Sequence, residues 1–380
     1  MRIIVAILGI ALLLVVLWDA FETVILPRRV TRKLRLTRLF YRSTWRPWRA
    51  VARALPSTKR RESFLSFFGP LSLLFLLGVW AAGLIVGFAL LHWSMGSLVI
   101  TSGGTANFAT DLYLSGTTFF TLGLGDVVPR GTMARLLTVT EGGMGFGFLA
   151  VVIGYLPVLY QAFSRREVNI SLLDARAGSP PTAGELLRRH SHAQGLEALT
   201  ALLRDWEHWC AELLESHLSY PSVGYFRSQH INQSWLSALT TILDTCSLVM
   251  AGIEGACERQ AELTFAMARH VTVDLAQVFN TPPRSPAKDR LPPAKLARLC
   301  AMLAAAGLQL REGQAVGQRL AELRHMYEPY VESLGDFFYL TLPPWMPESK
   351  RLDNWQVSAW ERSADIVRVG EASDRDREHF

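Results

Sequence analysis

Three long runs of apolar residues divide the first half of the chain, at positions 3–26, 64–93 and 133–163. Each run is long enough to cross a hydrocarbon layer about 30 Å thick as a helix. The first run lacks a small-residue cleavage site and stays apolar beyond two acidic residues, which favours a membrane-spanning helix over 1–26 rather than a signal peptide. The pattern therefore predicts three transmembrane helices.

The second half of the chain follows a different pattern, in which apolar residues recur at the three- and four-residue spacing of amphipathic helices. Leu196, Leu199 and Leu203 are examples of residues that share one helix face. Proline-rich breaks separate these stretches. We expect a helical domain over 167–340, followed by a tail over 341–380 that is partly disordered.

A basic segment over 27–63 joins the first two spans, with thirteen lysines and arginines and no acidic residue before Glu62. Aromatic residues are interleaved with these charges, so the segment is expected to lie on an anionic membrane surface. Nucleic-acid binding is the weaker interpretation, because both ends are tethered to membrane spans. The residues expected to contact lipid are Arg28, Arg29, Arg32, Lys33, Arg35, Arg38, Arg42, Trp45, Arg46 and Trp48.

Charge is distributed unevenly between the two halves. Residues 1–166 carry 18 basic and 6 acidic residues, a net charge of +12, whereas residues 167–380 carry 21 and 27, a net charge of −6. Because basic residues favour the cytoplasmic side of a membrane, the linker and the region after the third span are both expected to be cytoplasmic. The expected location is a plasma membrane, the inner membrane of a bacterium.

Enzymatic and metal-binding motifs are not evident in the C-terminal half. Its four cysteines form no C-x-x-C pair and are expected to be reduced thiols, and its histidines match no zinc pattern. No glycine-rich dinucleotide-binding fingerprint follows a strand. The sequence therefore predicts neither an enzyme nor a resident cofactor. It predicts a helical module whose ligand or partner is unknown.

The segment between the second and third spans is too apolar for a simple loop and too short for two further crossings. Residues 107–120 predict a short helix, with Asn107 as its N-cap and Asp111 in the first turn. The sequence T-L-G-L-G-D follows immediately at 121–126. Its alternating glycines permit backbone conformations in which carbonyl groups turn toward one axis. Rings of such carbonyls replace the hydration shell of a cation, and closing a ring requires several chains.

These residues resemble the pore of the potassium channel family, in the form with one pore loop per chain that is found in bacteria. The resemblance covers 107–166 and implies a pore domain over 64–166 in a homotetramer that conducts K⁺. It implies ion ligation by the backbone of the filter, bracing at the outer mouth, and a gating hinge with a kink in the third span. The residues concerned are Thr121, Leu122, Gly123, Leu124 and Gly125 in the filter, Asp126 at the mouth, and Gly145 and Pro157 in the span.

Two positions depart from the family pattern. Leu124 replaces the usual filter aromatic, and Thr117 stands where several members have a glutamate partner for the filter aspartate. Thr117 and Glu141 are the remaining candidates for bracing the filter; Glu141 is either a buried acid or a glutamate at the outer interface. The expected fold is all-α, with a re-entrant pore helix between spans two and three.

Three functions remain open on these grounds. The first is a potassium-selective channel gated at its inner helix. The second is a weakly selective cation channel of the same architecture, which the Leu124 substitution favours. The third is a non-conducting scaffold or signalling protein in the membrane, in which the glycine-rich segment is only a re-entrant turn.

Overall fold

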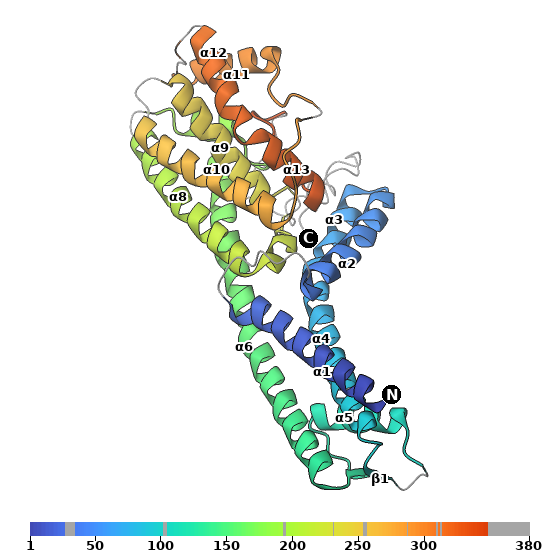
Figure 1. The fold of residues 1–380 in the computed structure, drawn as a ribbon. Helices are drawn as coiled ribbons and strands as arrows, with labels where there is room; N and C mark the ends of the chain where they lie inside the picture. The colour runs from blue at the N-terminus through green and yellow to red at the C-terminus, as the bar shows by residue number, and fades with distance from the viewer. Residues whose placement is uncertain are drawn as a thin grey trace, which may run out of the picture. The chain divides into compact units, whose positions relative to one another are not determined.

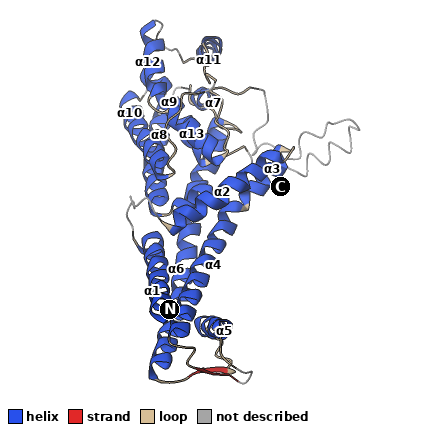
Figure 2. Ribbon diagram, turned by 45° about the vertical axis from the view of Figure 1, so that its right-hand side comes forward, coloured by secondary structure: helices blue, strands red, loops and turns tan. Residues whose placement is uncertain are grey.

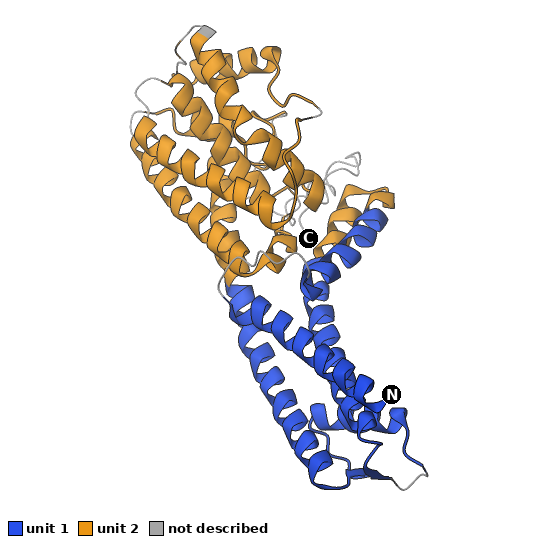
Figure 3. Cartoon of the chain, in the orientation of Figure 1, with its two compact units in different colours: residues 1–52, 67–161 blue, residues 53–66, 162–380 orange. Residues whose placement is uncertain are grey.

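The computed structural model describes residues 1–26, 35–101, 105–192, 195–230, 232–253, 257–286, 288–308, 311 and 314–348. The described part is almost entirely helical, which confirms the predicted fold class (Figure 2). It forms two compact units (Figure 3). Unit 1 consists of residues 1–52 and 67–161, and unit 2 of residues 53–66 and 162–380.

Unit 1 contains the three apolar spans. Its elements are α1 (Arg2–Ala20), a π-helical turn η1 (Phe21–Ile25), α2 (Leu36–Ala54), α4 (Phe68–Ser94), β1 (Val99–Thr101), α5 (Phe108–Phe119), β2 (Val127–Pro129) and α6 (Thr132–Ala177), the last of which continues into unit 2. The helical stretches long and apolar enough to cross a membrane include Arg2–Ile25, Thr58–Ser94 and Thr132–Ala177. The second and third are longer than the sequence predicts, because helical structure continues into polar residues at their ends.

Small residues allow α1 and α4 to pack closely. A Cβ atom at Gly87 would lie 2.7 Å from a side-chain carbon of Leu13, and one at Gly83 would lie 2.8 Å from Val16. Side chains at these positions would push the helices apart. The four-residue spacing of Gly83 and Gly87 is a familiar signal for close helix packing in membranes, and the sequence analysis missed it.

Asp19 ties three helices of unit 1 together. Its carboxylate is fully buried and accepts hydrogen bonds from the Thr37 backbone amide and hydroxyl and, at 3.0 Å, from the indole of Trp80. These donors lie on α2 and α4. Because an unpaired charge at such a depth is costly, this set of bonds fixes where α1 ends relative to the two other helices.

The amphipathic helix α2 changes several expectations about lipid contact. Trp45 is only 3% exposed and packs on Phe68, which also contacts Trp48, so Trp45 belongs to the interior of unit 1. The Arg35 guanidinium lies 3.4 Å from the carboxylate of Glu22. Arg38, Arg42 and Arg46 are exposed. The other expected lipid-contacting residues, Arg28, Arg29, Arg32 and Lys33, lie outside the described part.

Unit 2 is a helical assembly built around α9. Its elements are α3 (Thr58–Ser66), α7 (Ala183–Arg189), α8 (Gly195–Ser219), a 3-10 turn η2 (Pro221–Tyr225), α9 (Trp235–Gly252), α10 (Glu258–Val278), α11 (Pro293–Ala305), α12 (Gln314–His325) and α13 (Glu328–Phe338) (Figure 1). Although α9 is also apolar and long enough to cross a membrane, its residues are buried among α7, α10, α12 and α13. Its apolar character is therefore that of a central core helix.

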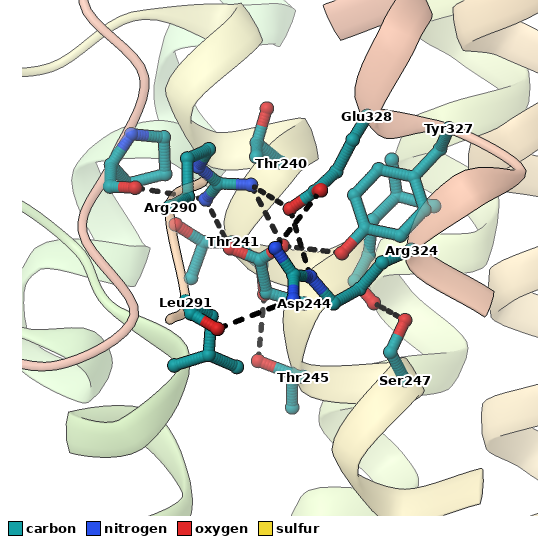
Figure 4. A network of polar contacts seen from close by, with 12 residues as sticks. Thr240, Thr241, Asp244, Thr245, Ser247, Arg290, Leu291, Arg324, Tyr327 and Glu328 are labelled. Carbon is teal, nitrogen blue, oxygen red and sulfur yellow. Dashed lines mark hydrogen bonds and ion pairs between the residues drawn. The ribbon is translucent and has the colours of Figure 1, made fainter. Parts of the chain in front are cut away.

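A buried polar network fastens the loop before α11 and the start of α13 to α9 (Figure 4). The Asp244 carboxylate accepts hydrogen bonds from the Arg290 guanidinium and from the Tyr327 hydroxyl, both at 2.5 Å. Although burial opposes it, the facing carboxylate of Asp244 raises the pKa of Arg290. Glu328 pairs with both Arg290 and Arg324. Each charge removed from water in this network therefore has an opposite partner.

The end of the basic linker belongs to unit 2, although the sequence suggests one continuous segment over 27–63. The Arg53 and Arg61 guanidinium groups lie over the Tyr339 ring, 5.7 and 5.1 Å from its centroid. Glu62 pairs with Arg227 at 3.4 Å, and Arg227 also donates a hydrogen bond to the carbonyl of residue 338. The segment leading into α4 is thus anchored on the helical unit.

Two further segments join the core of unit 2. Arg166, in the last part of α6, donates hydrogen bonds to the carbonyls of Val223 and Phe226 and accepts one at its own carbonyl from Trp209. The predicted tail begins with a buried residue, because Trp345 is 1% exposed and its carbonyl binds the amide of Gly184. Residues 349–380 of that tail lie outside the described part.

Candidate functional site

The short helix α5 is positioned by its two ends. At its start the Asn107 side chain accepts a hydrogen bond from the Thr110 amide at 3.1 Å, and the Thr110 hydroxyl accepts one from the Asn107 amide. This capping box satisfies amides that have no partner within the helix. The negative end of the helix dipole lies at the C-terminus of α5, at Phe119, two residues before the 121–126 segment begins.

The backbone after α5 alternates in handedness. Thr121, Gly123 and Gly125 have φ values of +58°, +58° and +79°, whereas Leu122 and Leu124 are not among the residues with positive φ. An ordinary strand directs successive carbonyls to opposite sides; alternation of positive and negative φ turns them to one side. Threonine pays about 1–2 kcal/mol for a left-handed conformation, and such strain is found at functional sites. The left-handed backbone at Thr121 therefore makes this segment a candidate functional site.

Hydrogen bonds on both sides hold this segment. The amide of Leu122 donates to the Thr117 carbonyl at 2.8 Å. The hydroxyl of Tyr113, which lies one turn before Thr117 on α5, is near enough to the Asp126 carboxylate for electrostatic interaction. Beyond Asp126, β2 pairs with β1 in antiparallel register, with Val128 opposite Ile100.

Tyr113 is a further side chain of α5 that interacts with the Asp126 carboxylate, in addition to the bracing residues predicted from the sequence. The Thr117 hydroxyl donates to two carbonyls of its own helix, those of Tyr113 and Leu114. A threonine side chain in a helix reaches these carbonyls directly. The position of Tyr113, one turn earlier on the same helix, is the sequence signal that was missed.

Gly145 has a packing role, and the hinge implied by resemblance stays a prediction. A Cβ atom at this position would lie 2.0 Å from the Phe119 carbonyl oxygen, so only glycine allows α6 to pass beneath the end of α5. Gly143 and Gly147 have no such neighbour in the described chain. Pro157 lies inside the uninterrupted helix α6.

Glu141 is fully buried, so of the two interpretations left open by the sequence, the surface glutamate is wrong for this chain. Its carboxylate lies 3.7 Å from the imidazole of His92 on α4 and 3.4 Å from the Ser115 hydroxyl on α5. His92 is not among the residues predicted from the sequence, because a lone histidine near the end of an apolar run carries no motif.

Apolar side chains around this site are exposed in the single chain. Leu122 and Leu124 are 60% and 63% exposed, and Val139 and Phe146 on α6 are 73% and 69% exposed. Exposed apolar surface of this extent on a membrane-spanning helix faces lipid or other subunits.

Residues 74–161, which contain α5, the 121–126 segment and the first part of α6, match a family model described as ion channel. This part of the chain is similar to ion channels. The match points to a transport protein of the membrane rather than to an enzyme. It confirms the coarse prediction of an ion channel and leaves the conducted ion to be established.

One curated relative is similar over part of the chain. It is the membrane protein YdjJ of Bacillus subtilis (strain 168), described as uncharacterized, with 27% identity over 192 residues. The alignment covers 50% of this chain and 55% of the relative, so it spans about half of each protein. No solved structure matches the chain.

The contact beneath α5 predicts opposite outcomes for two neighbouring glycines. Gly145→Ala should destabilise the protein by about 1–3 kcal/mol, because the added methyl group forces α5 and α6 apart. The matched variant Gly147→Ala should be neutral or stabilising by up to about 1 kcal/mol, since alanine is the better helix former. Thermal unfolding of the detergent-solubilised protein measures both, and equal melting temperatures for the two variants would contradict the packing role of Gly145.

Proposed function

We propose that the protein is a potassium channel subunit, in which four copies surround a common axis and K⁺ passes through a filter formed by Thr121, Leu122, Gly123, Leu124 and Gly125. The observation that carries the proposal is the alternating handedness of the backbone at these residues, within a domain that matches ion channels. Carbonyls turned to one side are the ligands that replace the hydration shell of a potassium ion.

Homotetrameric assembly is part of this proposal. One chain contributes a single segment of this type, and a single strand of carbonyls does not enclose an ion. The exposed apolar residues Leu122, Leu124 and Phe146 support contacts with further copies. Symmetry of this closed, cyclic kind is usual when one surface of each subunit binds a different surface of the next.

Leu124 favours a second candidate, a cation channel with weak selectivity. A leucine has no hydroxyl with which to hold the filter against its surroundings, and this side chain is 63% exposed in the single chain. The electrostatic interaction between Tyr113 and Asp126, at the outer end of the segment, favours the selective channel. The ratio of K⁺ to Na⁺ permeability separates the two candidates.

Unit 2 acts on the pore through two covalent connections. Residues 53–66 lead directly into α4, and α6 runs without interruption from unit 1 to Ala177 in unit 2. Arg227 and Arg166 anchor these connections within the helical unit. A ligand or partner with different affinities for two conformations of unit 2 would therefore shift the equilibrium between closed and open inner helices.

The proposed topology places the basic linker and unit 2 in the cytoplasm of a cell whose plasma membrane contains the channel. The exposed residues Arg38, Arg42 and Arg46 follow each other at four-residue spacing along one face of α2. Each such charge near an anionic lipid surface is worth about 1 kcal/mol. This face is the proposed site of lipid contact.

Conduction is tested by Gly123→Ala. Alanine disfavours the left-handed conformation of Gly123 by about 1–2 kcal/mol in each of four subunits, so K⁺ flux into liposomes should vanish while assembly persists. The matched variant Gly116→Ala, on α5 with no neighbour near the added methyl group, should retain flux. Reversal potentials of the wild type in mixed K⁺ and Na⁺ report selectivity. Undiminished flux in Gly123→Ala would remove this segment from the ion path.

Coupling of unit 2 to the pore is tested by Glu62→Gln, which removes the ion pair with Arg227. We expect the rate of K⁺ flux to change severalfold, with the permeability ratio of K⁺ to Na⁺ unchanged, because the anchor of α4 is altered and the filter is not. Glu322→Gln is the matched control, since it removes an exposed pair with Arg319. Equal flux rates in both variants and the wild type would show that this anchor has no part in opening.

Topology is tested by a cysteine at the exposed position Ser43 on α2. An impermeant thiol reagent added to intact cells should leave Ser43→Cys unlabelled, whereas it should label the protein after the membrane is permeabilised. The four native cysteines lie within 210–300 and are replaced by serine in the background used. Efficient labelling from outside the intact cell would reverse the proposed orientation.

A further inference from the structure

Three ionisable side chains are buried together behind the pore helix α5. They are His92 in the last turn of α4, Asp111 in the first turn of α5, and Glu141 on α6, and each is 0% exposed. His92 is near enough to both carboxylates for electrostatic interaction; its Nε2 lies 3.7 Å from Glu141 Oε2. The cluster therefore joins all three elements that form the pore domain.

The hydrogen bonds within the cluster leave several of its atoms unsatisfied. Asp111 accepts a hydrogen bond from the Ser97 hydroxyl at 2.6 Å, and Glu141 accepts one from Ser115 at 3.4 Å. Within the described residues, neither ring nitrogen of His92 has a hydrogen-bond partner, and neither do Oδ1 of Asp111 and Oε1 of Glu141. Donors and acceptors are thus both present, close together, in a region where unpaired polar groups are costly.

Protonation of His92 changes what this arrangement can hold. A protonated imidazole has two N–H donors and a positive charge, so it can serve the carboxylates of α5 and α6 at once. A neutral imidazole has one donor and no charge, so it leaves at least one of the two buried carboxyl groups without this partner. Two arginines lie at the loop that follows α4: the guanidinium of Arg2 lies beside Gly96, and the backbone amide of Arg130 donates a hydrogen bond to the carbonyl of Leu98.

We propose that the His92–Asp111–Glu141 cluster is a proton-sensitive clamp that holds the pore helix α5 against α4 and α6, and that it makes conduction depend on pH. The clamped state binds the additional proton, so acidic conditions favour it, and it is lost as the pH rises. The link to conduction rests on the proposed channel function. The link to packing of α5 does not.

The proposal predicts a pH dependence in two separate measurements. Because one linked proton shifts an equilibrium by up to about tenfold per pH unit, K⁺ flux in liposomes should fall about tenfold between about pH 6 and about pH 8. The melting temperature of the detergent-solubilised protein should fall over the same interval. His92→Gln should abolish most of both changes, whereas His325→Gln, at an exposed position on α12, should leave both as in the wild type.

A second variant, Glu141→Gln, tests the same proposal if His92→Gln does not fold. Glu141→Gln keeps the shape of the side chain and removes the charge that the imidazolium pairs with, so it too should flatten the pH profile. A wild type whose flux and melting temperature both ignore pH in this interval would overturn the proposal, as would variants that retain the full wild-type dependence. If no pH supports flux but the melting temperature shows the predicted profile, the channel function fails and the clamp stands.

Discussion

The position of residues 121–126 depends on the close contact between Gly145 of α6 and the carbonyl of Phe119 at the end of α5. The segment makes few hydrogen bonds of its own, and those at its start return to α5. The orientation of residues 121–126 is therefore set by α5. A helix of this length is not stable alone, so its place must be set by packing against neighbours. Because residue 145 is a glycine, α6 can approach the end of α5 until their backbone atoms are in contact.

Polar groups set the alignment of the helices around this contact. Apolar faces in a membrane lack a strong preference for one register, because lipid chains solvate them as well as other helices do. Three buried acids each contact residues outside their own helix. Asp19 contacts Thr37 and Trp80, Asp111 contacts Ser97, and Glu141 contacts His92 and Ser115. Sliding one helix along another would leave a charge unpaired. These few bonds therefore select one arrangement among many that the apolar surfaces would accept.

The basic linker has two roles that its uniform composition does not distinguish. Its first part, α2, belongs to the same unit as α1 and α4, buries Trp45 and exposes Arg38, Arg42 and Arg46. Its last part belongs to the helical unit, where Arg61 lies over the Tyr339 ring and Glu62 pairs with Arg227. Arginine serves both purposes, because its guanidinium binds anionic headgroups, carboxylates and aromatic faces.

The sequence by itself determined the properties that depend on local pattern. Apolar length predicted the three spans, helical periodicity predicted the C-terminal helices, and Asn107 marked the start of α5, because these signals lie within a few turns of one helix. The tertiary structure decided what depends on residues distant in sequence. It placed the Phe119 carbonyl against Gly145, directed the Thr117 hydroxyl to carbonyls of its own helix, and brought His92 to Glu141. The physical reason is that a side chain's partner is set by helix packing, and the spacing of residues along one helix carries no information about which atoms a second helix will bring within reach.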